Sequence, residues 1–278
     1  MDARVMLFNF LGGLGLFLFG MRVMGDGLQK VAGDRMRRIL EVLTTTPLRG
    51  VLIGALVTGI IQSSSATTVM LVGFVNAGLM TLRQAFGVIM GANIGTTMTA
   101  QLIAFKITAF ALPLVGVGVL INLAGRRKTY KYLGSVILGL GLLLLGLEFM
   151  GDAMKPLRNS PAFVNLMTSF GNYPLLGVLI GIAMTSLIQS SSATIAMLMA
   201  VAGQGLITFD AALPILFGDN IGTCITAALA SIGVSRAAKR TALAHMLFNV
   251  FGALFFVLFL PQFKAFVLAI SGNADINR

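Results

Sequence analysis

Long apolar stretches alternate with short polar or basic ones along the whole chain. The first apolar stretch, residues 5–24, is long enough to cross a bilayer core of about 30 Å as a helix. Residues 26–46 combine basic and apolar positions and predict an amphipathic helix lying on the membrane surface. Because the apolar runs are continuous rather than alternating, they favour membrane-spanning helices over a β-barrel. The pattern therefore predicts an all-α polytopic membrane protein.

Four consecutive polar residues, Gln-Ser-Ser-Ser at positions 62–65, interrupt the apolar stretch at residues 47–80. Such a cluster is costly inside hydrocarbon unless it faces protein, a cavity or a ligand. The stretch is also too short for two full spans and a turn, which need about 40 residues. It therefore predicts a re-entrant helical hairpin with the polar residues at its tip. The next apolar segment, residues 86–105, holds glycine, asparagine and threonine at positions 91–97, which predicts a broken helix.

The polar cluster and its surroundings occur twice. The sequence Gln-Ser-Ser-Ser-Ala-Thr at positions 62–67 returns at positions 189–194, and residues 218–223 match residues 91–96 with the same offset. A duplication of this kind is typical of transporters built from two structural repeats. The predicted boundaries are residues 1–128 for the first repeat (hairpin 47–80, broken helix 86–105), residues 129–263 for the second repeat (hairpin 174–207, broken helix 211–231), and residues 264–278 for a C-terminal tail.

The two repeats are expected to have opposite orientations in the membrane. Each has three full spans and a hairpin that enters and leaves on one side, so each repeat crosses the membrane an odd number of times. The loop charges agree, because the side that contains the loop at residues 125–131 would carry most of the basic residues. The positive-inside rule places that side in the cytoplasm and both termini outside, in the cell inner (plasma) membrane. The two hairpin tips would then enter from opposite faces and meet near the midplane.

Composition narrows the classes of function. The 278 residues are 57% hydrophobic and only 10% charged, with a net charge of +11. The basic residues lie in loops between apolar segments, which membrane topology explains, so we expect no nucleic-acid partner. Cys224 is the only cysteine, which excludes an intramolecular disulfide and a cysteine-based transition-metal site. The expected partners are the lipid bilayer and small ions, and the sequence is compatible with a homodimer.

The chemistry of the tips favours an anion. At each tip one half-helix ends and another begins, and the first backbone N–H groups of a helix are unpaired and carry positive partial charge. Serine hydroxyls cap such a helix start and donate to anion oxygens, and helix starts commonly bind phosphate. Freed carbonyls together with threonine and asparagine oxygens at the broken helices would suit Na+. Asp219 is the acidic residue closest to such a break, either as a cation ligand or as a helix cap.

The paired Gln-Ser-Ser-Ser and Gly-x-Asn-Ile-Gly-Thr motifs resemble the type II sodium-dependent phosphate cotransporter family, over about residues 12–256. Many bacterial relatives carry a soluble C-terminal domain that is not part of this sequence, so the resemblance implies either a minimal bacterial-type member or a shortened form of a longer protein. It implies Na+-coupled symport of inorganic phosphate, with no cofactor besides the coupling ion. The implied phosphate ligands are Gln62, Ser63, Ser64, Ser65, Gln189, Ser190, Ser191 and Ser192. The Na+ ligands are expected among Gln62, Thr67, Asn93, Thr96, Thr97, Gln189, Thr194, Asp219, Asn220 and Thr223.

Two other functions agree with parts of the pattern. The same architecture could carry another small oxyanion or a carboxylate, because the tips by themselves argue only for an anion. A membrane enzyme such as a lipid-phosphate phosphatase would need a nucleophile with a base in reach, or a metal cluster. His245 is the only histidine and lies far from the serine motifs in the predicted topology. We therefore expect a transporter with no catalytic residues.

Overall fold

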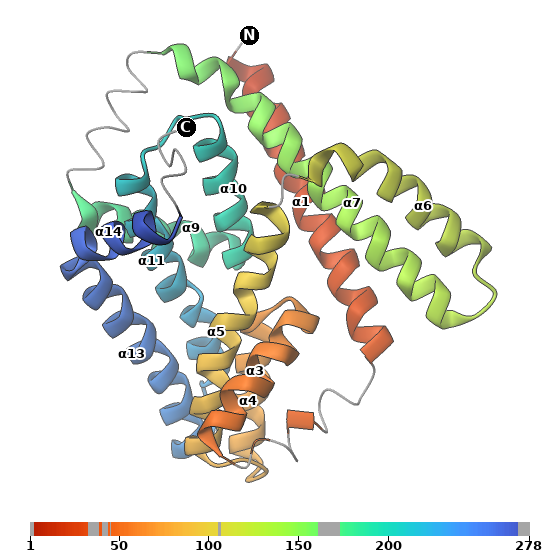
Figure 1. Ribbon diagram of the computed structural model, residues 1–278. Coiled ribbons are helices and arrows are strands. Elements are labelled where there is room, and N and C mark those ends of the chain that lie inside the picture. Colours follow the sequence, from red (N-terminus) through yellow and green to blue (C-terminus); the bar gives the residue numbers. More distant parts are fainter. Residues whose placement is uncertain are drawn as a thin grey trace. The chain divides into compact units, whose positions relative to one another are not determined.

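The computed structural model describes residues 3–32, 39–40, 44, 46–104, 107–160 and 173–271. Within these ranges the regular secondary structure is helical and contains no strand (Figure 1). Four segments are long and apolar enough to cross a membrane, namely Arg4–Val31, Lys128–Leu157, Phe209–Ala230 and Arg236–Leu258. The prediction of an all-helical chain with several candidate membrane-spanning segments is therefore confirmed.

The chain divides into two compact units, each of which contains one Gln-Ser-Ser-Ser motif. The first unit comprises Gly12–Glu148 and Thr226–His245. The second unit comprises Met1–Leu11, Phe149–Ile225 and Met246–Arg278. Three long helices contribute residues to both units, α1 (Ala3–Ala32), α7 (Lys128–Met154) and α13 (Arg236–Leu258).

In the first unit, α1 packs against α7 (Lys128–Met154) through glycines on both helices. A Cβ atom placed on Gly20 would lie 2.6 Å from the carbonyl oxygen of Gly139, and one placed on Gly27 would lie 2.9 Å from that of Tyr132. Only glycine permits two helix backbones to approach so closely. Because increasing positions along α1 meet decreasing positions along α7, the two helices are antiparallel.

The α1 helix is longer than the predicted first span. It continues without a break to Ala32, so residues 26–32 extend the span instead of beginning a separate surface helix. Gly27 faces α7 at close range, so this part of α1 is packed against another helix. Residues 33–38, 41–43 and 45 of the predicted surface helix lie outside the described ranges.

Three helices surround the first Gln-Ser-Ser-Ser motif: α3 (Pro47–Ile61), α4 (Ser64–Asn76) and α5 (Leu82–Ala104). The α3 helix lies along α5, and α4 packs against both. Apolar side chains from all three helices are buried together, so the motif sits on a packed apolar core. The fully buried members of this core are Leu40, Val57, Leu71, Ala85, Val88 and Ile89.

The prediction of a broken helix at residues 86–105 is wrong, because α5 is continuous from Leu82 to Ala104. Gly91 and Gly95 are packing positions instead. A Cβ atom on Gly91 would lie 2.7 Å from the backbone nitrogen of Ala55, and one on Gly95 would lie 2.6 Å from the carbonyl oxygen of Ala55. Glycine therefore serves the close approach of α3 to α5, and the α5 backbone remains hydrogen-bonded along its length.

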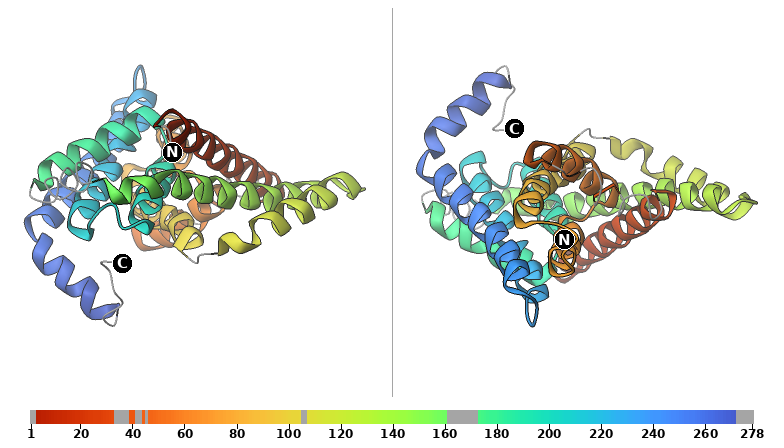
Figure 2. Two further views of the ribbon diagram at one scale, coloured as in Figure 1. Left: turned by 90° about the horizontal axis from the view of Figure 1, so that it is seen from above. Right: turned by 90° about the horizontal axis from the view of Figure 1, so that it is seen from below.

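A short 3-10 helix, Ile107–Phe110, leads into α6 (Ala111–Ala124). The α6 helix runs beside α7 in both views of Figure 2. Asn122 joins the two helices, because its Nδ2 donates to the carbonyl oxygen of Lys131 at 3.0 Å and to Ser135 Oγ at 2.8 Å. Asn122 is thus a packing residue within the first unit.

The second unit contains the same sequence of helices around the second motif. They are α9 (Pro174–Ile188), α10 (Ser191–Gly203) and α11 (Phe209–Gly222). The α9 helix lies along α11, and α10 packs against both. The break predicted within residues 211–231 is present but slight: the helix is interrupted at Thr223, whose backbone keeps near-helical angles (φ −61°, ψ −25°), and resumes as α12 (Cys224–Ala230).

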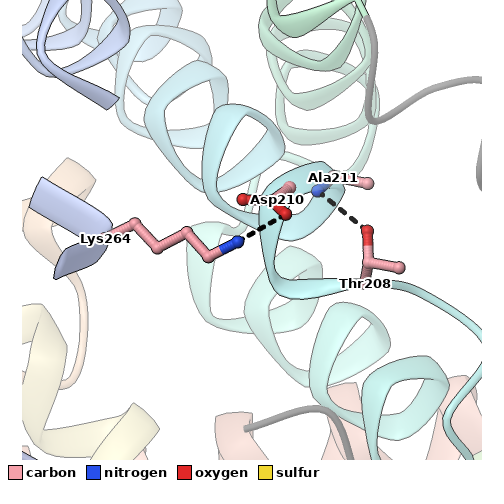
Figure 3. Close-up of polar contacts among 4 residues, drawn as sticks. All are labelled: Thr208, Asp210, Ala211 and Lys264. Atoms are coloured by element: carbon pink, nitrogen blue, oxygen red, sulfur yellow. Dashed lines mark hydrogen bonds and ion pairs between the residues drawn. The ribbon is translucent and has the colours of Figure 1, made fainter. Parts of the chain in front are cut away.

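The start of α11 is held by α14 (Leu260–Ile270) (Figure 3). Lys264 Nζ and Asp210 Oδ2 form an ion pair at 2.7 Å, and Thr208 caps α11 by accepting a hydrogen bond from the backbone N–H of Ala211. The rings of Phe217, Phe256 and Phe263 pack together in the same unit. Residues 264–270, predicted to belong to a tail, are helical as part of α14, whereas residues 272–278 lie outside the described ranges.

Candidate anion and cation site at the helix breaks

Both Gln-Ser-Ser-Ser motifs form the same backbone break between two helices. Gln62 ends α3 in the left-handed region (φ 60°, ψ 26°), and Gln189 ends α9 with the same geometry (φ 60°, ψ 25°). These two glutamines are the only non-glycine residues with positive φ in the described part of the chain. A left-handed conformation costs an ordinary L-residue about 1–2 kcal/mol, and such strain clusters at functional sites. The repeated strain makes the two breaks the candidate functional site.

A serine caps the helix that begins after each break. Ser63 Oγ accepts a hydrogen bond from the backbone N–H of Ala66 at 3.1 Å, and Ser190 Oγ accepts one from Ala193 at 3.3 Å. Each cap bonds one backbone N–H group in the first turn of α4 or α10. The other N–H groups at the helix start have no partner within the helix and carry positive partial charge. We call the resulting pair of breaks, residues 62–65 and 189–192, the first tip and the second tip.

The remaining serines of the tips present free hydroxyls. Within the described residues, the side chains of these serines form no hydrogen bond with another residue. Three of them are buried, with exposed fractions of 5%, 9% and 4% for Ser64, Ser191 and Ser192. Hydroxyls held at a helix start without a protein partner are ready to donate to an anion. The four residues are Ser64, Ser65, Ser191 and Ser192.

The two tip glutamines are held by different partners. Gln62 Oε1 accepts a hydrogen bond from Thr99 Oγ1 at 2.5 Å, and Gln62 Nε2 donates to the carbonyl oxygen of Gly59. Gln189 Nε2 donates to the carbonyl oxygen of Ser186 at 2.5 Å. Thr99 on α5 therefore orients the amide of the first tip, a role that the sequence did not reveal.

A pair of threonines bridges the two helices on either side of each tip. Thr58 Oγ1 donates to Thr67 Oγ1 at 3.0 Å, and the hydroxyls of Thr185 and Thr194 are 2.9 Å apart. All four side chains are at most 1% exposed. Thr67 and Thr194 were predicted as cation ligands, whereas Thr58 and Thr185 were missed. Their common position, four residues before each glutamine, was the signal that could have found them.

The second tip has an acidic neighbour that the first tip lacks. Thr185 Oγ1 donates to Asp219 Oδ1 at 2.5 Å, which brings Asp219 into one cluster with Thr185 and Thr194. Asp219 is 1% exposed, and the equivalent residue of the first repeat, Ala92, is also 1% exposed. Asp219 therefore faces the tip of its own unit instead of capping a helix at the membrane surface.

The other predicted cation ligands are bonded to the backbone of their own helices. Thr96 Oγ1 donates to the carbonyl oxygen of Ala92 at 3.0 Å, and Thr97 Oγ1 donates to that of Ile94 at 2.7 Å. Asn93 is half-buried on the same helix. In the second unit, Asn220 Nδ2 donates to Leu216 at 3.2 Å, and Thr223 Oγ1 donates to Asp219 at 3.0 Å, in both cases to the carbonyl oxygen. Their assignment as Na+ ligands stays a prediction.

Comparisons with known proteins agree on one family. The model of the Na+/Pi-cotransporter family matches residues 16–152 and 150–272. The chain is 35% identical over 267 residues to "Uncharacterized protein YqeW" of Bacillus subtilis, with 96% of this chain and 87% of that protein aligned. No solved structure matches it.

Two further relatives have names that state an activity. The chain is 30% identical over 248 residues to "Putative inorganic phosphate export protein YjbB" of Escherichia coli K12, which covers 89% of this chain and 46% of that protein. It therefore spans about half the length of this relative. It is also 38% identical over 96 residues to "Sodium-dependent phosphate transport protein 2B" of Homo sapiens, which covers 34% of this chain and 14% of that protein.

Proposed function

Because the chain belongs to the Na+/Pi-cotransporter family, we propose that it is a secondary active transporter that couples Na+ movement to the symport of inorganic phosphate across the plasma membrane. The observation that carries this proposal is the pair of strained glutamine breaks, each followed by a serine-capped helix start. Phosphate would bind between the two tips near the midplane. Movements of the two repeats would expose this site to each side in turn.

The tips supply the donors that a phosphate dianion needs. Each tip offers unpaired backbone N–H groups and two serine hydroxyls that bond to no other described residue, those of Ser64 and Ser65 at one tip and of Ser191 and Ser192 at the other. The amides of Gln62 and Gln189 have donor and acceptor sides and can bind a protonated phosphate oxygen. The same hydrogen-bond donors would also bind sulfate, arsenate or a carboxylate, which remain the alternative substrates.

Oxygen atoms beside the tips supply the groups that Na+ prefers. The first tip has the hydroxyls of Thr58 and Thr67, and the second tip has those of Thr185 and Thr194 together with the Asp219 carboxylate. The other proposed Na+ ligands are Gln62, Asn93, Thr96, Thr97, Gln189, Asn220 and Thr223.

We propose opposite orientations for the two repeats. The antiparallel packing of α1 against α7 supports this, because these helices begin the first and second repeats. Gly20 is in close contact with Gly139, and Gly13 is in close contact with Gly146. The duplication matches Gly13 with Gly139 and Gly20 with Gly146, so it converts one of these contacts into the other. Two repeats related by a twofold axis in the membrane plane have this pattern of contacts. Both termini would then lie outside the cytoplasm.

Flux measurements in proteoliposomes would test the proposal. We expect an inward Na+ gradient to drive uptake of radiolabelled phosphate and an equal K+ gradient to drive none. Uptake that persists unchanged in K+ would overturn the coupling to Na+. Competition by sulfate, arsenate and small carboxylates would then rank the alternative substrates.

The name of the Escherichia coli relative favours one second candidate, phosphate export. A secondary transporter moves substrate in whichever direction the combined gradients of substrate and ions favour. Measurements of phosphate efflux from preloaded proteoliposomes, with an outward phosphate gradient, would distinguish export from symport. Efflux that does not require Na+ would support an exporter, and efflux that stops in its absence would support reversible symport.

A further inference from the structure

Two connecting segments of the first unit lie side by side, the turn between α4 and α5 and the turn between α12 and α13. The backbone N–H of Ser235 in the second turn donates to Asn76 Oδ1, at the end of α4, at 2.9 Å. Next to this bond, Val72 of α4 is buried against Ala227 of α12 and Ala238 of α13. Because α5 begins shortly after Asn76, the starts of α5 and α13 lie at the same end of the first unit.

Four exposed basic side chains lie at these two helix starts. Arg83 is in the first turn of α5, and Arg236, Lys239 and Arg240 are in the first two turns of α13. We call these four residues the basic cluster. Their side chains form no hydrogen bond or ion pair with another described residue. Acidic residues are absent from positions 42–147 and 220–274 of the sequence, so none of the helices α3, α4, α5, α12 and α13 contains a counter-charge.

This arrangement of charges is unfavourable within the protein. The first turn of a helix carries the positive end of the helix dipole, which disfavours a cation there. The second repeat has the favourable residue at the same position, because Asp210 matches Arg83 and forms an ion pair with Lys264. The first unit instead adds like charges to the positive ends of two helices. Anions from outside the chain would offset both costs.

The position of the basic cluster indicates which anions these are. Arg236 begins the segment Arg236–Leu258, which is long and apolar enough to cross a membrane, so the cluster lies where this segment would leave the bilayer. Two aliphatic side chains at the same turns are exposed, Leu79 by 53% and Ile232 by 74%. Basic side chains beside exposed aliphatic ones match a bilayer surface, where headgroup phosphates adjoin acyl chains. A free anion would use the charges alone and leave the aliphatic side chains in water.

We propose that the basic cluster binds the headgroup phosphates of anionic phospholipids, with Leu79 and Ile232 inserted among the adjoining acyl chains. Groups of four or more basic residues beside a membrane-spanning helix are typical of such lipid recognition. The predicted topology places this end of the first unit on the cytoplasmic side, where the leaflet is negatively charged. The lipid site would hold the end of α4 opposite the first tip at the membrane surface. It goes beyond the proposed function, because it does not depend on which ion or anion is transported.

Tryptophan fluorescence provides a direct test, because the chain contains no tryptophan. Ile232→Trp would place a single reporter beside the basic cluster, and Leu79→Trp is the alternative if that variant does not fold. The full chain would be reconstituted into phosphatidylcholine vesicles with increasing fractions of phosphatidylglycerol whose brominated acyl chains quench a neighbouring tryptophan, or of brominated phosphatidylcholine. We expect stronger quenching by the anionic lipid at equal mole fraction. Leu179→Trp is the control reporter, since Leu179 is exposed on α9, which contains no basic residue, and it should show no preference.

Removal of single charges completes the test. Arg236→Gln or Lys239→Gln, each combined with Ile232→Trp, should lower the preference for the anionic lipid by up to about fivefold. Lys155→Gln is the matched control, because it removes one exposed charge that is paired with Asp152, and it should leave the preference unchanged. Equal quenching by the two lipids, or a preference that survives removal of all four charges, would overturn the proposal. A preference that inorganic phosphate abolishes, but chloride of equal ionic strength does not, would reveal a site for the free anion and would also overturn it.

Discussion

The two tips share one backbone and differ in the side chains behind it. Gln62 and Gln189 adopt the same left-handed conformation, and Ser63 and Ser190 form the same cap. Behind the tips, Asp219 replaces Ala92. Equal backbones suit the anion-binding task that we propose for both tips. The unequal neighbours make the surroundings of the second tip acidic, whereas Ala92 leaves the same position of the first unit neutral.

The helices that support the tips differ in the same way. The α5 helix is continuous, whereas its counterpart is interrupted at Thr223 between α11 and α12. Glycine nevertheless packs both helices closely, with Gly91 of α5 against α3 and Gly218 of α11 against α9. The duplicated glycines therefore maintain close packing in both repeats, and the interruption is a feature of the second repeat alone.

Overpacking should affect the two repeats equally and most severely. A Cβ atom on Gly91 would lie 2.7 Å from the nitrogen of Ala55, and one on Gly218 would lie 2.8 Å from the carbonyl carbon of Val178. Gly91→Leu and Gly218→Leu should each destabilise the fold by about 3 kcal/mol or more, because backbone atoms cannot move aside as side chains do. Recovery of monodisperse protein from membranes would measure this. Gly73→Leu is the control, since nothing lies within 4 Å of a Cβ atom there, and normal recovery of Gly91→Leu would contradict the packing account.

Removal of a bridging threonine should affect the two tips unequally. Thr185→Val removes a donor to the Asp219 carboxylate and should lower the free energy of unfolding by about 1.5–3 kcal/mol. Thr58→Val removes a bond between neutral hydroxyls and should lower it by about 0.5–1.5 kcal/mol. Thermal unfolding in Na+-free buffer would compare them. Equal losses would mean that Asp219 adds nothing to the second tip.

Thr99 should matter for the first tip through Gln62. Thr99→Val frees the Gln62 amide and should weaken phosphate binding by about 0.5–1.5 kcal/mol, or up to roughly tenfold. Phosphate titrations at saturating Na+ would measure the change. Thr241→Val is a matched control, because Thr241 is buried and bonds to the backbone of its own helix, α13. An effect of Thr241→Val as large as that of Thr99→Val would refute this positioning role.

The ion pair at the start of α11 should have the smallest effect. Lys264 and Asp210 are 34% and 45% exposed, so solvent screens their attraction. Lys264→Met should lower the free energy of unfolding by about 0–1 kcal/mol. Lys155→Met breaks the more exposed pair with Asp152 and serves as the reference for a surface ion pair. A loss well above that range for Lys264→Met would show that α14 supports α11 more strongly than the packing indicates.

The positions of the tips followed from the sequence, because four polar residues in an apolar run admit few structural explanations. The continuity of α5 did not, because glycine is equally common at helix breaks and at close helix contacts, and only the position of Ala55 beside Gly91 distinguishes them. Thr58, Thr99 and Thr185 were missed because a threonine in an apolar helix usually bonds to its own backbone. The partner across the tip is visible only in three dimensions.

The central claim is that the two tips together bind phosphate. Equilibrium binding of radiolabelled phosphate to purified wild type, Ser64→Ala and Ser191→Ala in Na+ buffer tests it most directly, with Ser231→Ala as the control at an exposed site outside the tips. Loss of one donor to a charged ligand should weaken binding by about 1.5–3 kcal/mol, or tenfold or more, in each tip variant and leave the control unchanged. Wild-type affinity in both tip variants would contradict the account.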